Sequence, residues 1–556
     1  MKQADVRRAA PRRLSYVATL AALALASGAW ADGLSKPDAL NMVRLGHNDM
    51  QNRPLYQPTV HKYPSTVQNS FAGKTLLFAG THSANNGNPP CTGRTLPNPL
   101  NGGACEPDGT MIVDVTNPTH PEVVKHLPPA TSATLAQMVR VCDGQTGKLG
   151  LTGHVYMLRN DGGTQHEVYD VTDPVNPALL SVVVNGLTST HKNWWECDTG
   201  FAWLVAGAGP NAPNPDGWTT NQHVKLFDLS DPSNPRYIRD IGLVGQNPGS
   251  SVSTLTSGIH GPIVALTNPK TGEFINRAYM PYGTESNGVI QIVDRAKVLP
   301  QGYTTRAGQT GPLVSGSWDG LDTDRAQHPT DDDLRAIVVG SMDMTPSEGG
   351  HSACPVYGIP LRHFQGFTNY TTRDYIIGVS EETDLMCTGA PHNAFMIDAT
   401  RAIVDEAENP TSGEEHPQSV STMQVFEDSA KPDYCTRGTR FGPHSCNEVL
   451  AHVPSTFNPQ DWGKLTFISW FDGGARAFDI RDPYHPKDVA HYVPAVTPLQ
   501  FGEQPPSIVG GVARPDVSVN NLEVDSSGII YAVDRIGYGL NILMLTGPAA
   551  AIRNQP

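Results

Sequence analysis

The chain has 556 residues, with 39 Lys and Arg against 54 Asp and Glu, and a formal net charge of −15. This balance excludes a nucleic-acid-binding protein, because no basic stripe is available to neutralise phosphates. The 54 Gly and 47 Pro, in a chain that is 38% hydrophobic and 17% charged, are typical of a folded protein with many short strands joined by turns.

Residues 1–31 have the features of a secretory signal peptide. Four arginines precede a short apolar run at residues 17–26, and Ala-Trp-Ala at residues 29–31 offers a small-residue cleavage site. The apolar run is too short to span a bilayer, and no later run approaches that length. We therefore predict a mature chain of residues 32–556 that is periplasmic or secreted and has no integral membrane segment.

The eight cysteines fit an oxidising compartment, where disulfides persist. Eight cysteines allow many pairings, so the sequence alone leaves the connectivity open. Nearness along the chain and matching repeat positions lead to four pairs as a hypothesis: Cys91–Cys105, Cys142–Cys197, Cys354–Cys387 and Cys435–Cys446. The alternative, a thiolate metal site, lacks any C-x-x-C spacing.

One pattern recurs along the chain: a β-rich run that ends in Asp, followed by a turn bounded by Pro. Residues 166–177 (His-Glu-Val-Tyr-Asp-Val-Thr-Asp-Pro-Val-Asn-Pro) are a clear copy. We interpret the Asp as a turn cap, because it recurs once per repeat and its carboxylate can accept backbone N–H bonds. Successive copies lie 56 to 104 residues apart, the spacing of propeller blades with loop insertions. The repeated residues are Asp114, Asp170, Asp228, Asp294, Asp398 and Asp479.

Each repeat is interpreted as four strands, and seven such sets follow one another. Their extents are 60–127, 135–185, 191–243, 260–300, 351–425, 444–493 and 520–544. The last set lacks a fourth strand, which residues 41–46 can supply, and this closure removes the exposed sheet edges. We predict an all-β fold, a seven-bladed β-propeller closed by an N-terminal strand, with a pair of β-sandwiches as the alternative. Insertions near residues 299–335 and 402–432 would act as lids if they lie on the face of the site.

The repeats, together with residues 521–535 (Asn-Leu-Glu-Val-Asp-Ser-Ser-Gly-Ile-Ile-Tyr-Ala-Val-Asp-Arg), resemble the LVIVD-repeat family of bacterial exported proteins. The resemblance covers most of the mature chain. It implies a β-propeller and an exported location. It implies no reaction, because that family carries no settled one, and function must therefore be argued from the site.

Four histidines open the first strand of four consecutive repeats, where propeller geometry brings side chains of different blades together around the axis. These residues are His191, His260, His351 and His444. The equivalent position of blade 2, near Ala136, is not a histidine. In blade 7 the equivalent residue is Asn520 or Asn521. Converging neutral imidazoles suit copper, iron or zinc, and a site without thiolates leaves positions open for oxygen or substrate. The alternative is a structural role, in which each ring bonds a neighbouring carbonyl.

Other polar residues fall on the same predicted face: His82, Glu285, Glu381, Glu382, His392, Asp472 and Arg535. We predict His82 as a further metal ligand, since it shares the imidazole chemistry. Candidate catalytic or supporting groups are Glu285, Glu382, His392 and Arg535. A carboxylate among them could orient a metal-bound His. The ring is analogous to the His-lined propellers of carotenoid oxygenases, which hold iron, and of copper propellers similar to nitrous-oxide reductase, although none of their diagnostic motifs is present.

The leading hypothesis is an exported metal-dependent oxidoreductase that uses copper or iron on a small-molecule substrate. A second hypothesis is a non-catalytic propeller that presents its loops to a protein or carbohydrate partner. A third is a hydrolase that uses zinc-activated water. The sequence contains no G-x-S-x-G, H-E-x-x-H or Walker A motif.

Overall fold

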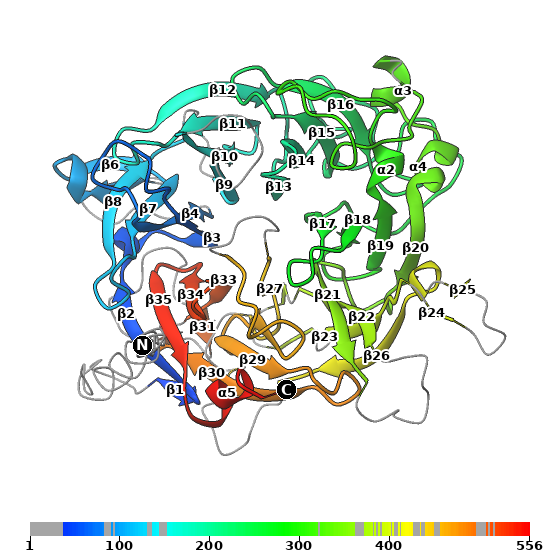
Figure 1. The fold of residues 1–556 in the computed structure, drawn as a ribbon. Coiled ribbons are helices and arrows are strands. Elements are labelled where there is room, and N and C mark those ends of the chain that lie inside the picture. Colours follow the sequence, from blue (N-terminus) through cyan, green and yellow to red (C-terminus); the bar gives the residue numbers. More distant parts are fainter. Residues whose placement is uncertain are drawn as a thin grey trace, which may run out of the picture.

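A computed structural model shows seven antiparallel sheets arranged as blades around a central axis, six of four strands and one of five (Figure 1). This confirms the predicted seven-bladed propeller. The structure describes residues 37–555 apart from 83–90, 93–94, 130–135, 144–152, 321–322, 362–371, 382, 385–386, 390–391, 402, 405–409, 412, 426–433, 435–439, 450–455, 496–506, 510–511 and 515–516. The predicted signal peptide lies outside the described residues.

The strands of each blade follow one another from the axis to the rim. Blade 1 has β3 (Leu55–Lys62), β4 (Thr75–Thr81), β7 (Thr110–Asp114) and β8 (Glu122–Leu127). Blade 2 has β9 (Val139–Asp143), β10 (Val155–Asp161), β11 (Gln165–Asp170) and β12 (Ala178–Val184). Blade 3 has β13 (Asn193–Trp195), β14 (Phe201–Ala206), β15 (His223–Asp228) and β16 (Arg236–Ile241). Blade 4 has β17 (Ile263–Thr267), β18 (Phe274–Tyr282), β19 (Val289–Asp294) and β20 (Val338–Asp343).

The remaining blades incorporate both ends of the chain. Blade 5 has β21 (Ser352–Pro360), β22 (Thr372–Val379), β23 (Ala394–Asp398) and β26 (Gln418–Met423). Blade 6 has β27 (Ser445–Cys446), β28 (Leu465–Ser469), β29 (Ala475–Asp479), β30 (Lys487–Val493) and β1 (Asp38–Leu40). Blade 7 has β33 (Val519–Val524), β34 (Ile529–Asp534), β35 (Leu540–Leu545) and β2 (Met42–Asn48).

Short elements occupy the connections between these strands. Three two-stranded ribbons pair β5 (Thr95–Asn98) with β6 (Ala104–Pro107), β24 (Ile403–Val404) with β25 (Pro410–Thr411), and β31 (Ser507–Val509) with β32 (Val512–Arg514). The α-helices are α2 (Arg295–Val298), α3 (Thr323–Gln327), α4 (Asp331–Ile337) and α5 (Gly547–Ile552). The 3-10 turns are η1 (Met50–Asn52), η2 (Pro99–Asn101) and η3 (Gly413–Glu415). Among the described residues, no helix is long and apolar enough to cross a membrane.

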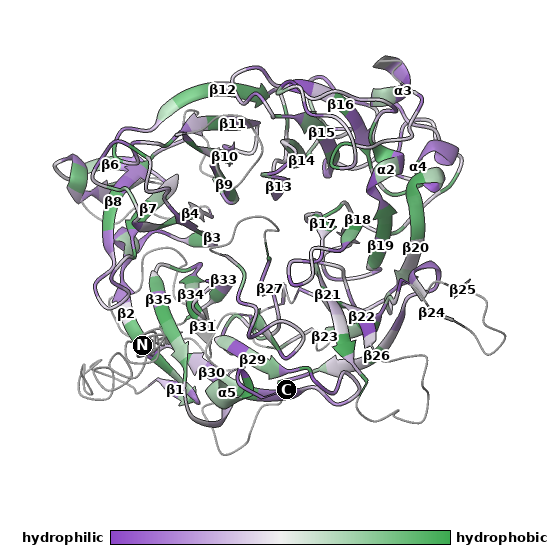
Figure 2. Cartoon of the chain, viewed as in Figure 1, coloured by the Kyte–Doolittle hydropathy of each residue, from purple (hydrophilic) through white to green (hydrophobic). Residues whose placement is uncertain are grey.

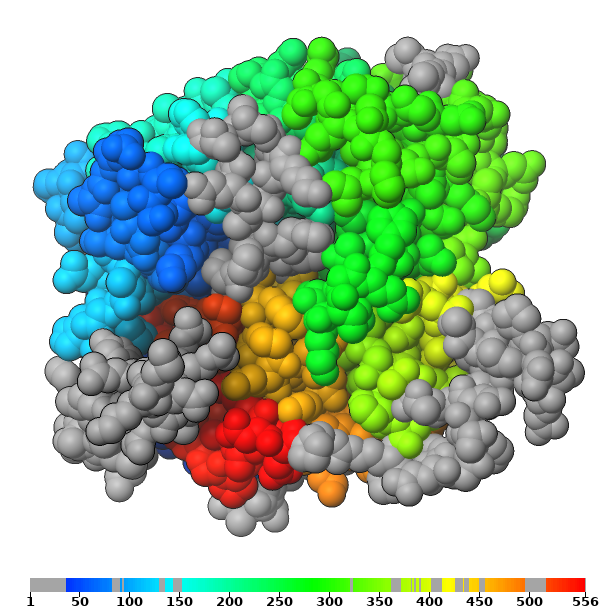
Figure 3. Space-filling view, viewed as in Figure 1, coloured from blue at the N-terminus to red at the C-terminus, as the bar shows by residue number. Residues whose placement is uncertain are grey.

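The N-terminal strand closes the ring, as predicted. β2 pairs antiparallel with β35, from Met42 opposite Leu545 to Asn48 opposite Leu540. The sequence did not predict β1, which adds a fifth strand to blade 6 by pairing with β30. At the other terminus α5 lies beside blade 6, where Arg553 makes two hydrogen bonds to Asp461 (2.7 and 3.0 Å; Figure 3, red beside orange). Both ends of the described chain are therefore fastened into the last two blades.

The six repeat aspartates are turn caps, which confirms their interpretation. Each ends the third strand of its blade and accepts a hydrogen bond from the backbone N–H two residues later, at 2.9–3.1 Å. The same short-range bond follows the third strand in six blades, and in blade 4 it caps the start of α2, so this part of the repeat is architectural.

Two predicted blade extents are wrong. Blade 1 begins at Leu55 and not at residue 60, and the outer strand of blade 4 is β20, which follows the 299–335 insertion instead of preceding residue 300. That insertion joins the third and fourth strands. Since neighbouring strands are antiparallel, it leaves the blade at the end opposite to the start of the innermost strand. The described residues of 299–335, and those between β23 and β26, therefore lie away from the face of the histidines, and the condition for a lid is not met there.

Apolar side chains fill the space between blades, and polar side chains gather towards the axis. Figure 2 shows β19 and β35 as apolar strands and β13, beside the axis, as hydrophilic. Trp194, Trp203 and Trp470 are buried in one continuous core that extends from blade 2 to blade 6. This agrees with the expectation that such aromatic residues at strands fill space between blades.

Two disulfides join neighbouring blades at their innermost strands, Cys142–Cys197 and Cys354–Cys446, and a third, Cys91–Cys105, lies within blade 1. Cys91–Cys105 and Cys142–Cys197 are confirmed. Cys354 pairs with Cys446, so the predicted pairs Cys354–Cys387 and Cys435–Cys446 are wrong. Nearness in sequence misled the pairing, because β21 and β27 are adjacent in space although their cysteines are 92 residues apart. Cys387 is also disulfide-bonded, and Cys435 lies outside the described residues.

Candidate metal centre

Four histidines from blades 3 to 6 form a continuous arc at the axis, as predicted. The ring centroids of His191 and His260 are 4.8 Å apart, those of His260 and His351 are 4.3 Å apart, and those of His351 and His444 are 4.1 Å apart. All four side chains are buried. The register of the first strand brings them together, so the repeat architecture itself assembles the cluster.

Backbone hydrogen bonds hold each histidine at this register. The backbone N–H of each donates to a carbonyl near the end of the second strand of its own blade, at 2.8–3.2 Å. Blade 4 also needs a glycine directly after His260. A Cβ on Gly261 would lie only 2.5 Å from Lys192 Cδ. The side chain of Lys192 can pass Gly261 only because that residue has no side chain. The four donor–acceptor pairs are His191–Val205, His260–Pro281, His351–Val379 and His444–Ser469.

Glu381 lies among the Nε2 atoms of three of the histidines. Its carboxylate oxygens are 3.5 Å from His260 Nε2, 3.9 Å from His351 Nε2 and 3.7 Å from His444 Nε2. These distances are too long for good hydrogen bonds. Two ligands that each lie about 2.1 Å from one tetrahedral ion are about 3.4 Å apart, which is close to the observed spacing.

The hydrogen bond at its outer nitrogen shows which nitrogen of His444 carries the proton. His444 Nδ1 lies 2.7 Å from the Asn520 carbonyl oxygen, which can only accept, so Nδ1 carries the proton and Nε2 keeps its lone pair. His351 Nδ1 lies 3.0 Å from Ser352 Oγ. Burial lowers the pKa of His260, His351 and His444 well below the usual range, so all three rings are neutral at pH 7. A neutral imidazole that keeps a lone pair on the nitrogen facing the site is a ligand for a cation.

One buried nitrogen at the centre of this group lacks a hydrogen bond. His351 Nε2 has no hydrogen-bond partner within the described part of the chain. Leaving a buried polar atom unsatisfied costs about 1–3 kcal/mol, which a bound ion would remove. Two overlapping sets have one ligand atom per residue within 4.8 Å of one another: His191, His260 and His351, and His351, Glu381 and His444. The residues therefore fit a metal ion.

His191 differs from the other three histidines. Its Nδ1 donates to Gln137 Oε1 at 2.8 Å, and its Nε2 accepts from the Tyr56 hydroxyl at 3.1 Å. Burial raises the pKa of Tyr56 well above its usual value, so the phenol is a hydrogen-bond donor. The sequence prediction missed Tyr56 because it started blade 1 at residue 60. The start of β3 at Leu55 would have placed Tyr56 at the register of the histidines.

His82 and Arg535 lie beside the cluster. Arg535 Nη2 donates to His82 Nε2 at 2.9 Å, and the His82 ring stacks on Tyr56 with centroids 6.0 Å apart. The lone pair that would bind a metal is therefore already used by the guanidinium. Neither potential ligand set in the described chain contains His82, so its predicted role as a ligand gains no support from this structure.

Phe471 packs against the cluster with a strained backbone. Its ring lies 4.7 Å from His444, and the guanidinium groups of Arg440 and Arg535 lie 5.6 and 5.9 Å from its centroid. Its φ of 37° is unfavourable for a bulky residue, and such strain gathers at functional sites. Arg440 also donates to Glu381 Oε1 at 2.9 Å, which orients that carboxylate.

The other predicted residues are placed in different ways. Glu285 is exposed in the connection after β18 and belongs to neither potential ligand set, and Glu382 lies outside the described residues. The neighbouring Glu381 is the acidic residue in the site. His392 is buried beside it, with Nδ1 2.7 Å from Ser380 Oγ. Asp472 is also buried, next to Phe471.

A layer of buried charges lies directly below the histidines. Lys192 Nζ donates to Ser352 Oγ at 3.4 Å and lies 3.6 Å from Glu448 Oε1. Glu448 also pairs with Arg140, whose Nε donates to the Asn193 carbonyl at 3.1 Å. Since buried charges persist only when they are paired, this network closes the lower side of the cluster with satisfied groups.

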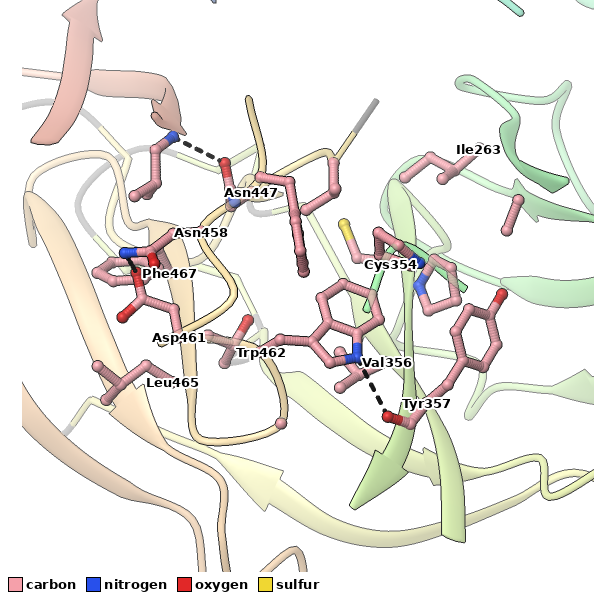
Figure 4. Close-up of a pocket in the computed structure, with 18 of the residues that line it drawn as sticks. Ile263, Cys354, Val356, Tyr357, Asn447, Asn458, Asp461, Trp462, Leu465 and Phe467 are labelled. Carbon is pink, nitrogen blue, oxygen red and sulfur yellow. Dashed lines mark hydrogen bonds between the residues drawn. The ribbon is translucent and has the colours of Figure 1, made fainter. Parts of the chain in front are cut away.

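A separate cavity lies along the innermost strands of blades 4 to 7, beyond the histidines. Val356, Tyr357, Asn447, Trp462 and Val524 are among its lining residues. Figure 4 shows Trp462 in the middle of this group, and its Nε1 donates to the Tyr357 carbonyl at 3.1 Å. Its nearest lining residues, Ile263, Cys354 and Asn447, each follow one of the histidines by three residues, about 10 Å along the strand, and Tyr357 lies about 20 Å from His351. The cavity is therefore distinct from the His cluster.

Comparisons with known proteins assign the chain to no family. No protein-family model and no curated protein matches the chain. The chain is similar to Sqt1 of Chaetomium thermophilum, at 9% identity over 91% of this chain and 99% of that chain, with a TM-score of 0.43. It is similar to the C-terminal WD40 domain of Sif2 at 9% identity over the same shares, with a TM-score of 0.41. The resemblance to LVIVD-repeat proteins stays a prediction.

Proposed function

We propose that the protein is an exported metal-dependent oxidoreductase that acts on a small molecule. Copper or iron is held by the set His351, Glu381 and His444, joined by His260, whose Nε2 lies 3.5 Å from the same carboxylate. The observation that carries this proposal is the Glu381 carboxylate among three neutral Nε2 atoms at 3.5–3.9 Å. Three imidazoles and one carboxylate are ligand types found around iron and copper.

The surrounding residues support the same assignment. Asn520 and Ser352 bond the outer nitrogens of two ligands, and Arg440 bonds the carboxylate. Such partners orient ligands and tune the ion. Disulfides between blades are consistent with an oxidising compartment, and the LVIVD-type repeats agree with export.

Metal content is the direct test. Protein purified without a His-tag, stripped with a chelator and incubated separately with Cu(II), Fe(II) or Zn(II), should retain one ion of copper or iron per chain. His351→Ala should lose that ion, whereas His485→Ala, which changes an exposed histidine, should retain it. No stoichiometric metal in the wild-type protein would overturn the proposal. Retention of zinc alone would favour the hydrolase.

The hydrolase could not use a serine triad at the nearest suitable residues. Ser380 Oγ and Glu348 Oε2 both approach the same nitrogen of His392, Nδ1, at 2.7 and 3.5 Å. A triad needs the nucleophile and the acid on opposite ring nitrogens. A hydrolytic function would therefore depend on the metal centre.

One observation favours the second candidate function, a binding propeller. The outer strand of blade 2 exposes Leu179, Leu180 and Val182, and Figure 2 shows β12 as an apolar strand at the rim. Exposed apolar patches mark interaction sites. This function predicts a protein partner that binds the metal-free protein as well as the metal-bound one and does not bind Leu179→Lys. Pull-down from a periplasmic extract would identify the partner, and titration with the purified partner would measure its affinity for each form.

A further inference from the structure

The four histidines of the arc are not equivalent as ligands. His260, His351 and His444 direct Nε2 towards Glu381, whereas His191 is hydrogen-bonded at both nitrogens. We propose, resting on the metal centre proposed above, that Tyr56 is a positioning residue that keeps His191 out of the ligand set. The ion then takes three imidazoles and one carboxylate instead of four imidazoles.

The geometry fixes which lone pair Tyr56 occupies. The amide oxygen of Gln137 accepts from His191 Nδ1, so the proton of the neutral ring is on Nδ1 and the lone pair is on Nε2. The Tyr56 hydroxyl donates to that Nε2. A lone pair held in this bond is not available to a cation.

Tyr56 cannot easily move away from this bond. The side chain is 2% exposed, and its ring packs edge-on against His191 at 5.4 Å and His444 at 5.7 Å and stacks on His82 at 6.0 Å. Its backbone carbonyl accepts from Asn520 Nδ2 at 3.0 Å, which ties blade 1 to blade 7. The hydroxyl is therefore held over His191 by contacts with three other blades.

Removal of the hydroxyl should convert His191 into a ligand. One of its ring nitrogens belongs to a set with His260 and His351 in which the ligand atoms lie within 4.8 Å of one another. In Tyr56→Phe the lone pair of His191 has no donor, and coordination is the available way to satisfy it. The net worth of one hydrogen bond corresponds to about five- to tenfold tighter metal binding.

Copper supplies the probe, because electron paramagnetic resonance and X-ray absorption of bound Cu(II) report how many imidazoles coordinate it. Wild-type protein should show three imidazoles and Tyr56→Phe four, with about five- to tenfold tighter binding of copper. The double variant Tyr56→Phe/His191→Ala should return to three. Tyr279→Phe removes a buried hydroxyl that bonds Tyr357 and should leave the copper spectrum unchanged.

The outcomes separate this inference from the proposed function. Stoichiometric copper with the same imidazole count in wild-type and Tyr56→Phe protein overturns the role of Tyr56 and leaves the metal centre intact. Four imidazoles in the wild-type protein overturn it as well. Absence of copper binding in the wild-type protein overturns both the metal centre and the inference.

Discussion

The disulfide between blades 5 and 6 should hold two of the metal ligands at their observed spacing. Cys354 lies three residues after His351, and Cys446 lies two residues after His444. β27 itself makes only two residue pairs with β28, so sheet pairing alone fixes it weakly. Cys354→Ala/Cys446→Ala removes a crosslink of 92-residue separation, which costs about 4–5 kcal/mol of unfolding free energy in the chain-entropy model. Loosened support of a ligand should also weaken copper binding about 10- to 100-fold.

Two measurements on two variants test this reasoning. Guanidinium unfolding followed by tryptophan fluorescence gives the change in stability, and titration with Cu(II) gives the affinity. The matched control is Cys91→Ala/Cys105→Ala, which removes a crosslink of 14-residue separation, costs about 3 kcal/mol and lies away from the histidines. If both variants bind copper as the wild-type protein does, the crosslink does not position the ligands, whatever it contributes to stability.

Two further predictions concern stability. Burial lowers the pKa of His166 from 6.5 to about 4, so the unfolded chain binds the proton first as the pH falls, and stability present at pH 7 is lost between about pH 6.5 and 4. Between pH 7 and pH 4.5 the unfolding free energy of the wild-type protein should fall by about 2–3 kcal/mol more than that of His166→Gln. An identical fall in the two proteins would refute the assignment. Among the turn caps, Asp228→Ala should cost about 3–4 kcal/mol, because Asp228 is buried and also bonds Tyr303 and the Arg306 N–H. Asp114→Ala should cost about 1 kcal/mol; equal losses in chemical denaturation would contradict the role of burial.

The fold was predictable because its signals are local and repeated. The Asp-capped turn requires only a carboxylate and a backbone N–H two residues away, so it is visible in the sequence six times. The closing strand was predictable from an incomplete last blade. β1 was not, because three residues at the edge of blade 6 carry no pattern of their own. The Cys354–Cys446 pair was missed for a similar reason, since adjacency of innermost strands outweighs nearness in sequence.

The candidate site was predictable only in the residues that share a register. His191, His260, His351 and His444 open equivalent strands, so the repeat brings them together. Glu381 follows the second strand of blade 5, where the sequence offers two adjacent glutamates and no means to choose between them.

What distinguishes one histidine from the next comes from other blades. Gln137 and Tyr56 belong to blades 2 and 1, and they take both nitrogens of His191. Asn520 of blade 7 takes only the outer nitrogen of His444, so its inner nitrogen still faces the carboxylate. Four residues that look alike in the sequence therefore differ in which lone pairs they can offer. A metal ion binds only to a nitrogen whose lone pair is free. The ligand set at this axis therefore depends on the hydrogen-bond partners that neighbouring blades supply to each histidine.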